Sequence, residues 1–304
     1  MPSRRSVFCI GHAVQDFVFA LPEMPRAAEK YRATAFISVG GGPAATAAVT
    51  VARLGGAARL AARVGDDAVA ALIVRELEGY GVDCTHVRRF AGCQSSLSAV
   101  MVDGQGERMI VNYLDPRLPP SPDWLPADLP ADVAVVLADT RWPEGAHALL
   151  GRARAQGRAA VLDADTPVPK DGALLAAATH VAFSAPGLAD YAGQADPRAA
   201  IVDVSRRLAA WCCVTLGSAG VMFAKGGRSG HVPAFKVAVA DTLGAGDVWH
   251  GAFALALAEG KPEGDAVVFA NAAAALKVQY RGGRAGVPTR ADVDQFLAQH
   301  GSGP

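Results

Sequence analysis

The segment of the chain with the clearest chemical potential is DTLGAGD, residues 241–247, which ends in the carboxylate of Asp247. An apolar, alanine-rich run follows it and predicts a helix over Val248–Glu259. Small residues let a ligand approach the backbone closely, and the free N–H groups of a first helical turn form an anion site. The amides of that site would be those of Gly244, Ala245 and Gly246. Such a site suits the negative charge of a phosphoryl group in transfer, and the adjacent carboxylate can accept the proton of an attacking alcohol.

A strand is expected just before this turn, because Phe235, Val237 and Val239 alternate with other residues in a period of two. Taken alone, an acidic residue at the start of a helix is more often an N-cap than a catalytic base. The longer string DTLGAGD in a strand–turn–helix context favours the catalytic interpretation of Asp247.

Three strings, in this order along the chain, together resemble the ribokinase-like family of carbohydrate kinases, also called the PfkB family. They are VGGGPAATAAVTVARLGG from Val39 followed by RVGDD from Arg63, then VTLGSAG at residues 214–220, and finally DTLGAGD at residues 241–247. The resemblance spans nearly the whole chain and implies an ATP-dependent sugar kinase that uses Mg²⁺. It also implies that Asp247 is the general base of that reaction.

The same resemblance implies which residues bind the substrates. The nucleotide-binding residues would be Thr215, Gly217, Gly220 and Asn271. The sugar would bind through Asp16, after the first strand, and would lie against the backbone of Gly41 and Gly42. A monovalent cation such as K⁺ would be held by the carbonyl groups of Asp241 and Thr242, opposite the Gly282–Gly286 loop.

The chain departs from the family pattern at two places. The family frequently has an Asn-x-x-Glu pair that organises the magnesium shell, whereas the comparable stretch here is SAPG, residues 184–187, which has no carboxylate. The glycines are followed by Pro43 and then Ala-Ala-Thr, whereas many members of the family have Lys or Asn there. Magnesium would therefore arrive with ATP, and the sugar contacts near Pro43 do not transfer from the family.

The segments AEKYRA, GERMIVNYLDP, VLADTRW and AFSAPGLA look closest to the family branch that phosphorylates 6-deoxy-6-sulfofructose. By that resemblance Lys30, Asn112 and Arg141 would bind the sulfonate, and O1 of the ketose would be the nucleophile. The residue types agree with an anion site, because the side chains of Arg and Lys both bind anions. Arg141 also follows a buried strand, at the edge where doubly wound sheets bind ligands. Each side chain can equally be solvated or ion-paired. Kinases for ribose, deoxy-ketogluconate or a nucleoside are the alternatives.

Short β-branched runs alternate with Ala- and Leu-rich helical runs, which predicts an α/β fold with a doubly wound, mostly parallel sheet flanked by helices. The expected strands are 7–10, 58–64, 133–138, 159–163, 180–183 and 212–216, and the first two expected helices are 44–54 and 67–80. Residues of about 14–39 and 95–114 have period-two character and predict a small β-sheet lid. We expect a single ribokinase-like domain over residues 1–304, and the resemblance implies a homodimer formed through the lid.

The composition narrows the class of protein. The chain has 304 residues, of which 51% are hydrophobic, and 29 basic residues balance 29 acidic ones, which gives no reason to expect a nucleic-acid partner. Five cysteines without a CxxC pair indicate reduced thiols. The first residues lack the pattern of a signal peptide, and no stretch is apolar enough for a bilayer. We expect a cytoplasmic protein that binds a small-molecule sugar and no membrane.

Two functions of other classes compete with the kinase. Gly40-x-Gly42-x-x-Ala45 formally fits the dinucleotide fingerprint of an NAD(P)-dependent oxidoreductase, but it follows a lid hairpin and leaves DTLGAGD unexplained. A non-catalytic sugar-binding regulator could keep the fold, and the intact Asp247 argues against it. The P-loop motif is absent, and the seven histidines are scattered, so that His250 is expected to pack and not to bind a metal.

Overall fold

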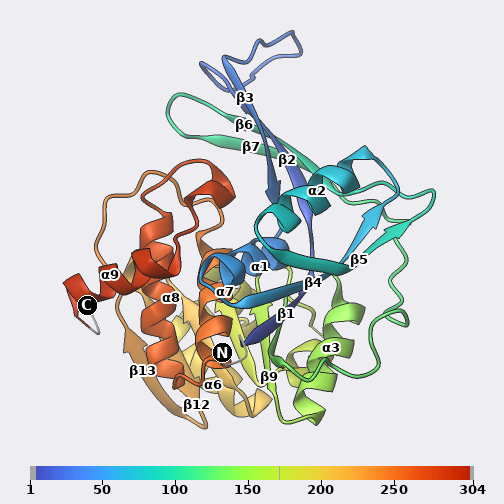
Figure 1. Cartoon of the computed structure of the whole chain (residues 1–304). Helices are drawn as coiled ribbons and strands as arrows, with labels where there is room; N and C mark the ends of the chain where they lie inside the picture. Colours follow the sequence, from blue (N-terminus) through green and yellow to red (C-terminus); the bar gives the residue numbers. More distant parts are fainter. Residues whose placement is uncertain (1–4, 171, 302–304) are drawn as a thin grey trace.

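A nine-stranded sheet forms the centre of the computed structural model, which describes residues 5–170 and 172–301 (Figure 1). Its strands lie in the order β13-β12-β11-β10-β9-β8-β1-β4-β5, parallel from β11 to β5 and antiparallel in the β12–β13 hairpin at one edge. Their bounds are Ser6–Gly11 (β1), Ala57–Gly65 (β4), Val82–Phe90 (β5), Val133–Ala138 (β8), Ala159–Ala164 (β9), His180–Ser184 (β10), Trp211–Thr215 (β11), Val221–Lys225 (β12) and Arg228–Val232 (β13). The predicted α/β sheet is confirmed, because helices cover both of its faces.

The helices form two layers that bury opposite sides of the same strands. One layer contains α1 (Pro43–Arg53), α2 (Ala68–Gly79), α7 (Ala245–Ala258), α8 (Glu263–Lys277) and α9 (Arg290–His300). The other contains α3 (Pro143–Ala155), α4 (Ala173–Ala177), α5 (Ala185–Ala192) and α6 (Pro197–Leu208). Strand β1 shows the division, since Val7 and Cys9 pack toward the first layer while Phe8 and Ile10 pack toward the second. This burial on both faces explains why the central strands β1 and β8 are almost continuously apolar.

Helix α7 lies inside its layer and not on the surface. Almost every side chain from Val248 to Ala258 is buried, because α1 packs on one side of α7 and α8 on the other. Gly251 permits the close crossing with α1, since a Cβ there would lie 2.6 Å from the carbonyl oxygen of Ala47. The position of the first turn of α7 is therefore fixed by the core, and that turn contains Asp247.

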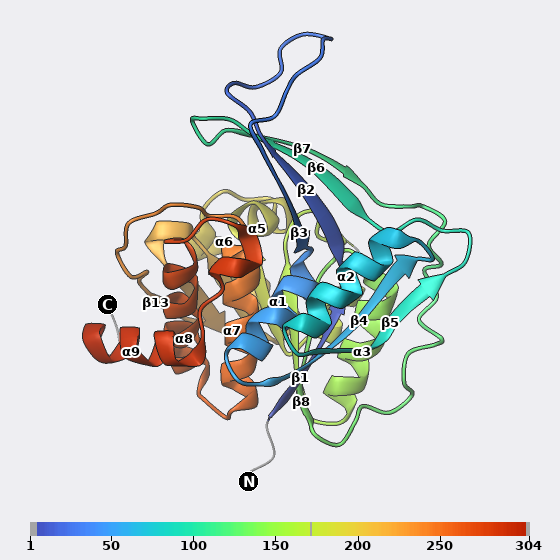
Figure 2. The ribbon, with the colours of Figure 1, turned by 45° about the horizontal axis from the view of Figure 1, so that its top comes forward.

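A separate four-stranded sheet projects from the main body (Figure 2). It comprises β3 (Ala35–Gly41), β2 (Val14–Ala20), β6 (Leu97–Val102) and β7 (Arg108–Tyr113), in the order β3-β2-β6-β7. Strand β2 is antiparallel to β3 and parallel to β6. The prediction of a small sheet from these two segments is confirmed.

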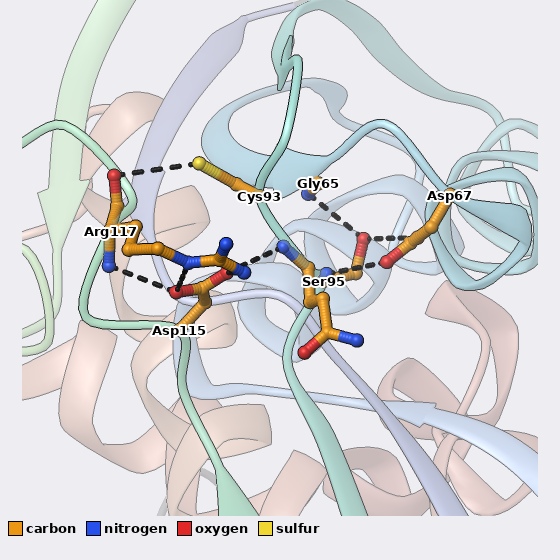
Figure 3. Close-up of polar contacts among 7 residues, drawn as sticks. Gly65, Asp67, Cys93, Ser95, Asp115 and Arg117 are labelled. Atoms are coloured by element: carbon orange, nitrogen blue, oxygen red, sulfur yellow. Dashed lines mark hydrogen bonds and ion pairs between the residues drawn. The ribbon is translucent and has the colours of Figure 1, made fainter.

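A polar network joins the small sheet to the main sheet (Figure 3). The carboxylate of Asp67 caps α2 and accepts hydrogen bonds from the N–H and hydroxyl of Ser95, both 2.7 Å. The Ser95 hydroxyl accepts from the N–H of Gly65 at 3.0 Å. Asp115, just after β7, accepts from the Arg117 guanidinium, which holds the pKa of that carboxyl well below its usual range. The RVGDD string thus has a structural role where the small sheet begins and ends.

The strand predicted over 235–239 is wrong. Strand β13 ends at Val232, and Pro233 then leads the chain away from the sheet into an irregular segment. No neighbouring strand pairs with this segment, and the N–H groups of Ala240 and Asp241 instead donate to the carbonyl oxygen of Val278. The helix that follows begins at Ala245, three residues earlier than predicted. The other expected strands and helices are confirmed, with ends that shift by a residue or two.

The cysteines agree with the expectation of reduced thiols. All five cysteines are free, and Cys212 and Cys213 are buried in β11. Within residues 5–170 and 172–301, none of the helices has the length and apolar character needed to cross a membrane.

Candidate active site

The turn before α7 has the geometry of an anion site. Gly244 is the N-cap of α7 and has φ 73°, a left-handed conformation that favours glycine. The carbonyl oxygen of Thr242 accepts from the N–H of Ala245 at 3.2 Å, and the carboxylate of Asp241 accepts from the N–H of Leu243 at 2.9 Å. These bonds shape the turn that precedes the first amides of the helix. Asp247 lies in the first turn of α7 and not at its cap, so the N-cap interpretation of Asp247 is wrong.

A cavity of about 590 Å³ borders this turn on one side. Its walls come from the end of β11, the irregular segment after β13, the start of α7 and the second half of α8. The lining includes all four predicted nucleotide-binding residues together with Ala245, Gly246 and Thr242: Thr215, Gly217, Gly220, Thr242, Ala245, Gly246 and Asn271. The volume is that of a typical small-molecule site. The fold therefore brings VTLGSAG, DTLGAGD and the second half of α8 to one cavity.

Several features of the cavity wall explain its residue types. Gly217 and Gly220 have positive φ, and a Cβ on Gly220 would lie 2.2 Å from the carbonyl oxygen of Val232. The amide of Asn271 is bonded at both ends, since its oxygen accepts from Nε1 of Trp249 at 2.8 Å and its nitrogen donates to the carbonyl oxygen of Pro233 at 3.1 Å. Asn271 therefore holds the irregular segment against α7 and α8. A Cβ on Gly246 would meet nothing within 4 Å, so the space above that residue is open.

The carboxylate of Asp247 lies in surroundings from which much of the water is excluded. This desolvation, followed by the negative charge of Asp163 in β9, raises the pKa of Asp247 to about 7. A base whose pKa lies near the pH of operation transfers protons efficiently. Asp247 can therefore be deprotonated at neutral pH and still accept a proton readily.

A buried arginine that the sequence analysis missed lies near Asp247. The guanidinium of Arg284 donates to the carbonyl oxygen of Gly41 at 2.6 Å and to the hydroxyl of Thr46 at 3.3 Å, and it pairs with Glu76 at 3.4 Å. Burial lowers the pKa of Arg284, while the carboxylates of Glu76, Asp247 and Asp16 act in the opposite direction. A fixed positive charge thus lies close to two predicted site carboxylates.

Two predicted sugar-binding residues share one row of the small sheet. Asp16 in β2 is opposite Ser98 in β6, and Ser98 is opposite Asn112 in β7. Asn112 donates to the Ser98 hydroxyl at 3.0 Å. Gly41 leaves room for this row, because a Cβ on it would lie 2.3 Å from a carboxylate oxygen of Asp16. Gly42 has φ 93°, and a Cβ there would lie 2.4 Å from the carbonyl oxygen of His12.

Among the described residues, no hydrogen bond or ion pair joins any two of the three residues predicted to bind an anionic substituent. Arg141 follows β8 and pairs with Asp165 at 3.3 Å. Asn112 lies in the small sheet with Asp16. Lys30 is exposed in the irregular connection between β2 and β3, and no hydrogen bond or ion pair among the described residues joins it to Arg141 or Asn112.

The structure gives magnesium no site composed of protein side chains alone. Within the described parts of the chain, no group of three or more His, Cys, Asp or Glu residues could hold a metal ion. Ser184, in the stretch that replaces the family's Asn-x-x-Glu pair, caps α5 by accepting from the N–H of Gly187 at 3.0 Å. His250 is buried beside Asp163, 3.4 Å from its carboxylate, as expected of a packing residue.

Comparisons with known proteins agree with this geometry. Residues 4–290 match the pfkB family carbohydrate kinases. The ribokinase of Bacillus subtilis is 29% identical over 97% of this chain and 100% of its own length. Fructokinase-1 of rice (Oryza sativa subsp. japonica) is 28% identical over 96% of this chain and 97% of its own. The structure of Arabidopsis thaliana ribokinase complexed with ribose and ATP superposes with a TM-score of 0.84 at 26% identity, over 97% of this chain and 98% of that chain. The chain belongs to the pfkB family and is an ATP-dependent carbohydrate kinase.

Proposed function

We propose that this kinase transfers the γ-phosphoryl group of ATP to the primary O1 hydroxyl of a ketose that has an anionic group at C6, such as 6-deoxy-6-sulfofructose. The observation that carries the proposal is the position of Asp247. Its carboxylate, with a pKa of about 7, belongs to the same short turn that borders the cavity of predicted nucleotide-binding residues. The guanidinium of Arg284 is near both Asp247 and Asp16, because its charge opposes the rise in the pKa of each carboxyl.

The reaction follows from these positions. The O1 oxygen attacks the γ-phosphorus as its proton passes to Asp247, the bond to the β-phosphate oxygen breaks, and ADP leaves. The amides of Gly244, Ala245 and Gly246 stabilise the charge on the peripheral oxygens. Magnesium that arrives with ATP would supply further neutralisation of that charge. Asp16 accepts hydrogen bonds from sugar hydroxyls.

The anionic group at C6 is proposed from a set of donors at the carboxyl ends of β1, β4 and β8. Arg141 keeps 31% of its side chain exposed, and the buried Nε2 of His12 has no hydrogen-bond partner. Arg63 lies over the ring of Trp142, 4.7 Å from its centroid. The charges of Arg141 and Arg63 both act on His12 and help to lower its pKa, so the three groups are near one another. Such a set suits a sulfonate or phosphate.

Turnover of a panel of sugars tests the substrate. We expect kcat/KM to be higher for sulfofructose or fructose 6-phosphate than for fructose and ribose. Arg141→Met should lower kcat/KM for the anionic ketose by about 10²-fold and leave fructose nearly unchanged. Arg207→Met, which removes a comparable exposed pair with Asp203 at 3.0 Å, is the matched control.

Ribose as the best substrate would overturn the proposed anion site in favour of a ribose kinase. The relatives named ribokinase support that second candidate, as does the row of Asp16 and Asn112, which suits neutral hydroxyls. Equal turnover of neutral and anionic ketoses would also count against the anion site.

We further propose that the small sheet covers the sugar as a lid and that its outer face pairs with a second copy of the chain. Phe36 and Val111 are 53% and 59% exposed, and Phe36 packs on Phe17 and Phe19 of the adjacent strand. An apolar face of this kind is typical of an interface. Light scattering should therefore give twice the monomer mass of 31.2 kDa.

The substitution Val111→Asp tests this pairing, because it should convert the dimer to monomer by placing a charge in the interface. Ser229→Asp, on edge strand β13 of the large sheet, should leave the dimer intact. A wild-type monomer would refute the pairing.

A further inference from the structure

The residues expected to hold K⁺ do not fit a free monovalent cation in this chain. The carbonyl oxygen of Thr242 already accepts from the N–H of Ala245. The carboxylate of Asp241 pairs with the guanidinium of Arg108 from β7 and accepts from the N–H of Leu243. A side chain of the protein itself packs against Gly286 of the opposite loop, Gly282–Gly286.

That side chain is Lys277, the last residue of α8, which is 1% exposed. Its aliphatic part passes beneath the loop, since a Cβ on Gly286 would lie 3.4 Å from Cδ of Lys277. Its ammonium group donates to the carbonyl oxygen of Tyr280 at 3.4 Å. A lysine is almost never buried to this extent without partners that compensate its charge.

The negative charge that acts on Lys277 is that of Asp241, which also pairs with Arg108. The two groups interact electrostatically in both directions, since Lys277 helps to lower the pKa of Asp241 and Asp241 opposes the fall that burial causes in the pKa of Lys277. The backbone is joined at the same place, because the N–H of Asp241 donates to the carbonyl oxygen of Val278 at 3.0 Å. The end of α8 is therefore joined to the start of DTLGAGD by backbone hydrogen bonds, and it packs against the Gly282–Gly286 loop through the side chain of Lys277.

We propose that the ammonium group of Lys277 takes the place of a monovalent cation, so that this kinase needs no K⁺ to order its anion site. An ammonium group has the same charge as K⁺ and brings three hydrogen-bond donors, and it is attached covalently. Its effect reaches the reaction through Asp241, whose carboxylate bonds to Leu243, the residue before the N-cap Gly244. Lys277 is thus a positioning residue for the amides that stabilise the transferred phosphoryl group.

The wild-type enzyme gives the first test. Its kcat should agree within about twofold in lithium, sodium, potassium, caesium and tetramethylammonium chlorides at equal ionic strength, because no cation site is left to fill. Its melting temperature should likewise not depend on which of these salts is present. A tenfold or larger activation by K⁺ over tetramethylammonium would overturn the proposal.

Two variants give the second test. Lys277→Met keeps the aliphatic bulk without the charge and should lower kcat by about 10- to 100-fold with little change in KM for ATP. Lys277→Ala also opens space, so that K⁺ or NH₄⁺ should raise both its rate and its melting temperature in a saturable manner. The control is Lys225→Met, an exposed lysine paired with Glu263 at 3.3 Å, which should behave as wild type.

Full activity of Lys277→Met in tetramethylammonium chloride would contradict the role of the ammonium group. Should both variants unfold, the wild-type salt series still decides the question. The inference rests on the carbohydrate kinase activity and not on the proposed sugar. The assays therefore use whichever sugar of the panel wild type phosphorylates fastest, so a wrong sugar and a wrong role for Lys277 give different results.

Discussion

Asp247→Asn should lower kcat by about 10²- to 10⁴-fold and leave the affinities for ATP and sugar nearly unchanged. The amide has the shape of the carboxylate but cannot accept the proton of the attacking hydroxyl. Steady-state kinetics, with calorimetric titration of an ATP analogue and of sugar, separates turnover from binding. The fold should tolerate the change, because Asp247 makes no capping bond to α7 and burial already favours its neutral form.

The pH profile gives this prediction its control. Asp247 is active only when deprotonated, so kcat/KM of the wild type should rise with pH through about 7, the pKa of Asp247 in the free enzyme. Titration of ATP itself affects wild type and variant alike, whereas the limb due to Asp247 should vanish in Asp247→Asn. A variant that keeps full activity, or the same profile as wild type, would remove Asp247 as the base.

The six adjacent strands from β11 to β4 could be predicted because most of their residues are buried on both faces, whereas β5, β12 and β13 at the edges were not predicted. Val133–Ala138, for example, is an unbroken apolar run, and it forms β8 at the residues predicted. The alternation of Phe235, Val237 and Val239 was misleading for a physical reason. Phe235, Val237 and Val239 all line the cavity, and Val239 is 64% exposed, so these apolar side chains form a cavity wall and not part of a sheet.

The glycine strings of the site were equally visible, because positive φ favours glycine at Gly220 and Gly244 and a close backbone contact also demands it at Gly220. The charged residues around the site were not visible in the sequence. Arg284 pairs with Glu76, 208 positions away, and no local pattern records such a contact. Lys277 ends an alanine-rich helix, where a lysine ordinarily lies in solvent near the helix dipole. Only the packing of the Gly282–Gly286 loop against Lys277 shows that this lysine is buried.

Gly246→Val should lower kcat by about 10²- to 10³-fold while sugar affinity and stability change little. A Cβ at this position meets no protein atom within 4 Å, so the protein has room for the side chain. That room belongs to the cavity, which Gly246 lines beside Ala245. The valine methyl groups would therefore occupy space needed by the transferred phosphoryl group and keep it from the amides.

A matched control exists at the start of the next helix. Gly264 is the second residue of α8 as Gly246 is of α7, and a Cβ on it also meets nothing within 4 Å. Gly264→Val should therefore have a similar effect on helix stability, yet it lies outside the cavity and should keep wild-type kcat. The melting temperatures of the two variants should agree within a few degrees. Their kcat values should differ by the same factor of about 10²- to 10³-fold. If Gly246→Val turned over as fast as Gly264→Val, the phosphoryl group would not pass over the first turn of α7, and the anion site would have to lie elsewhere.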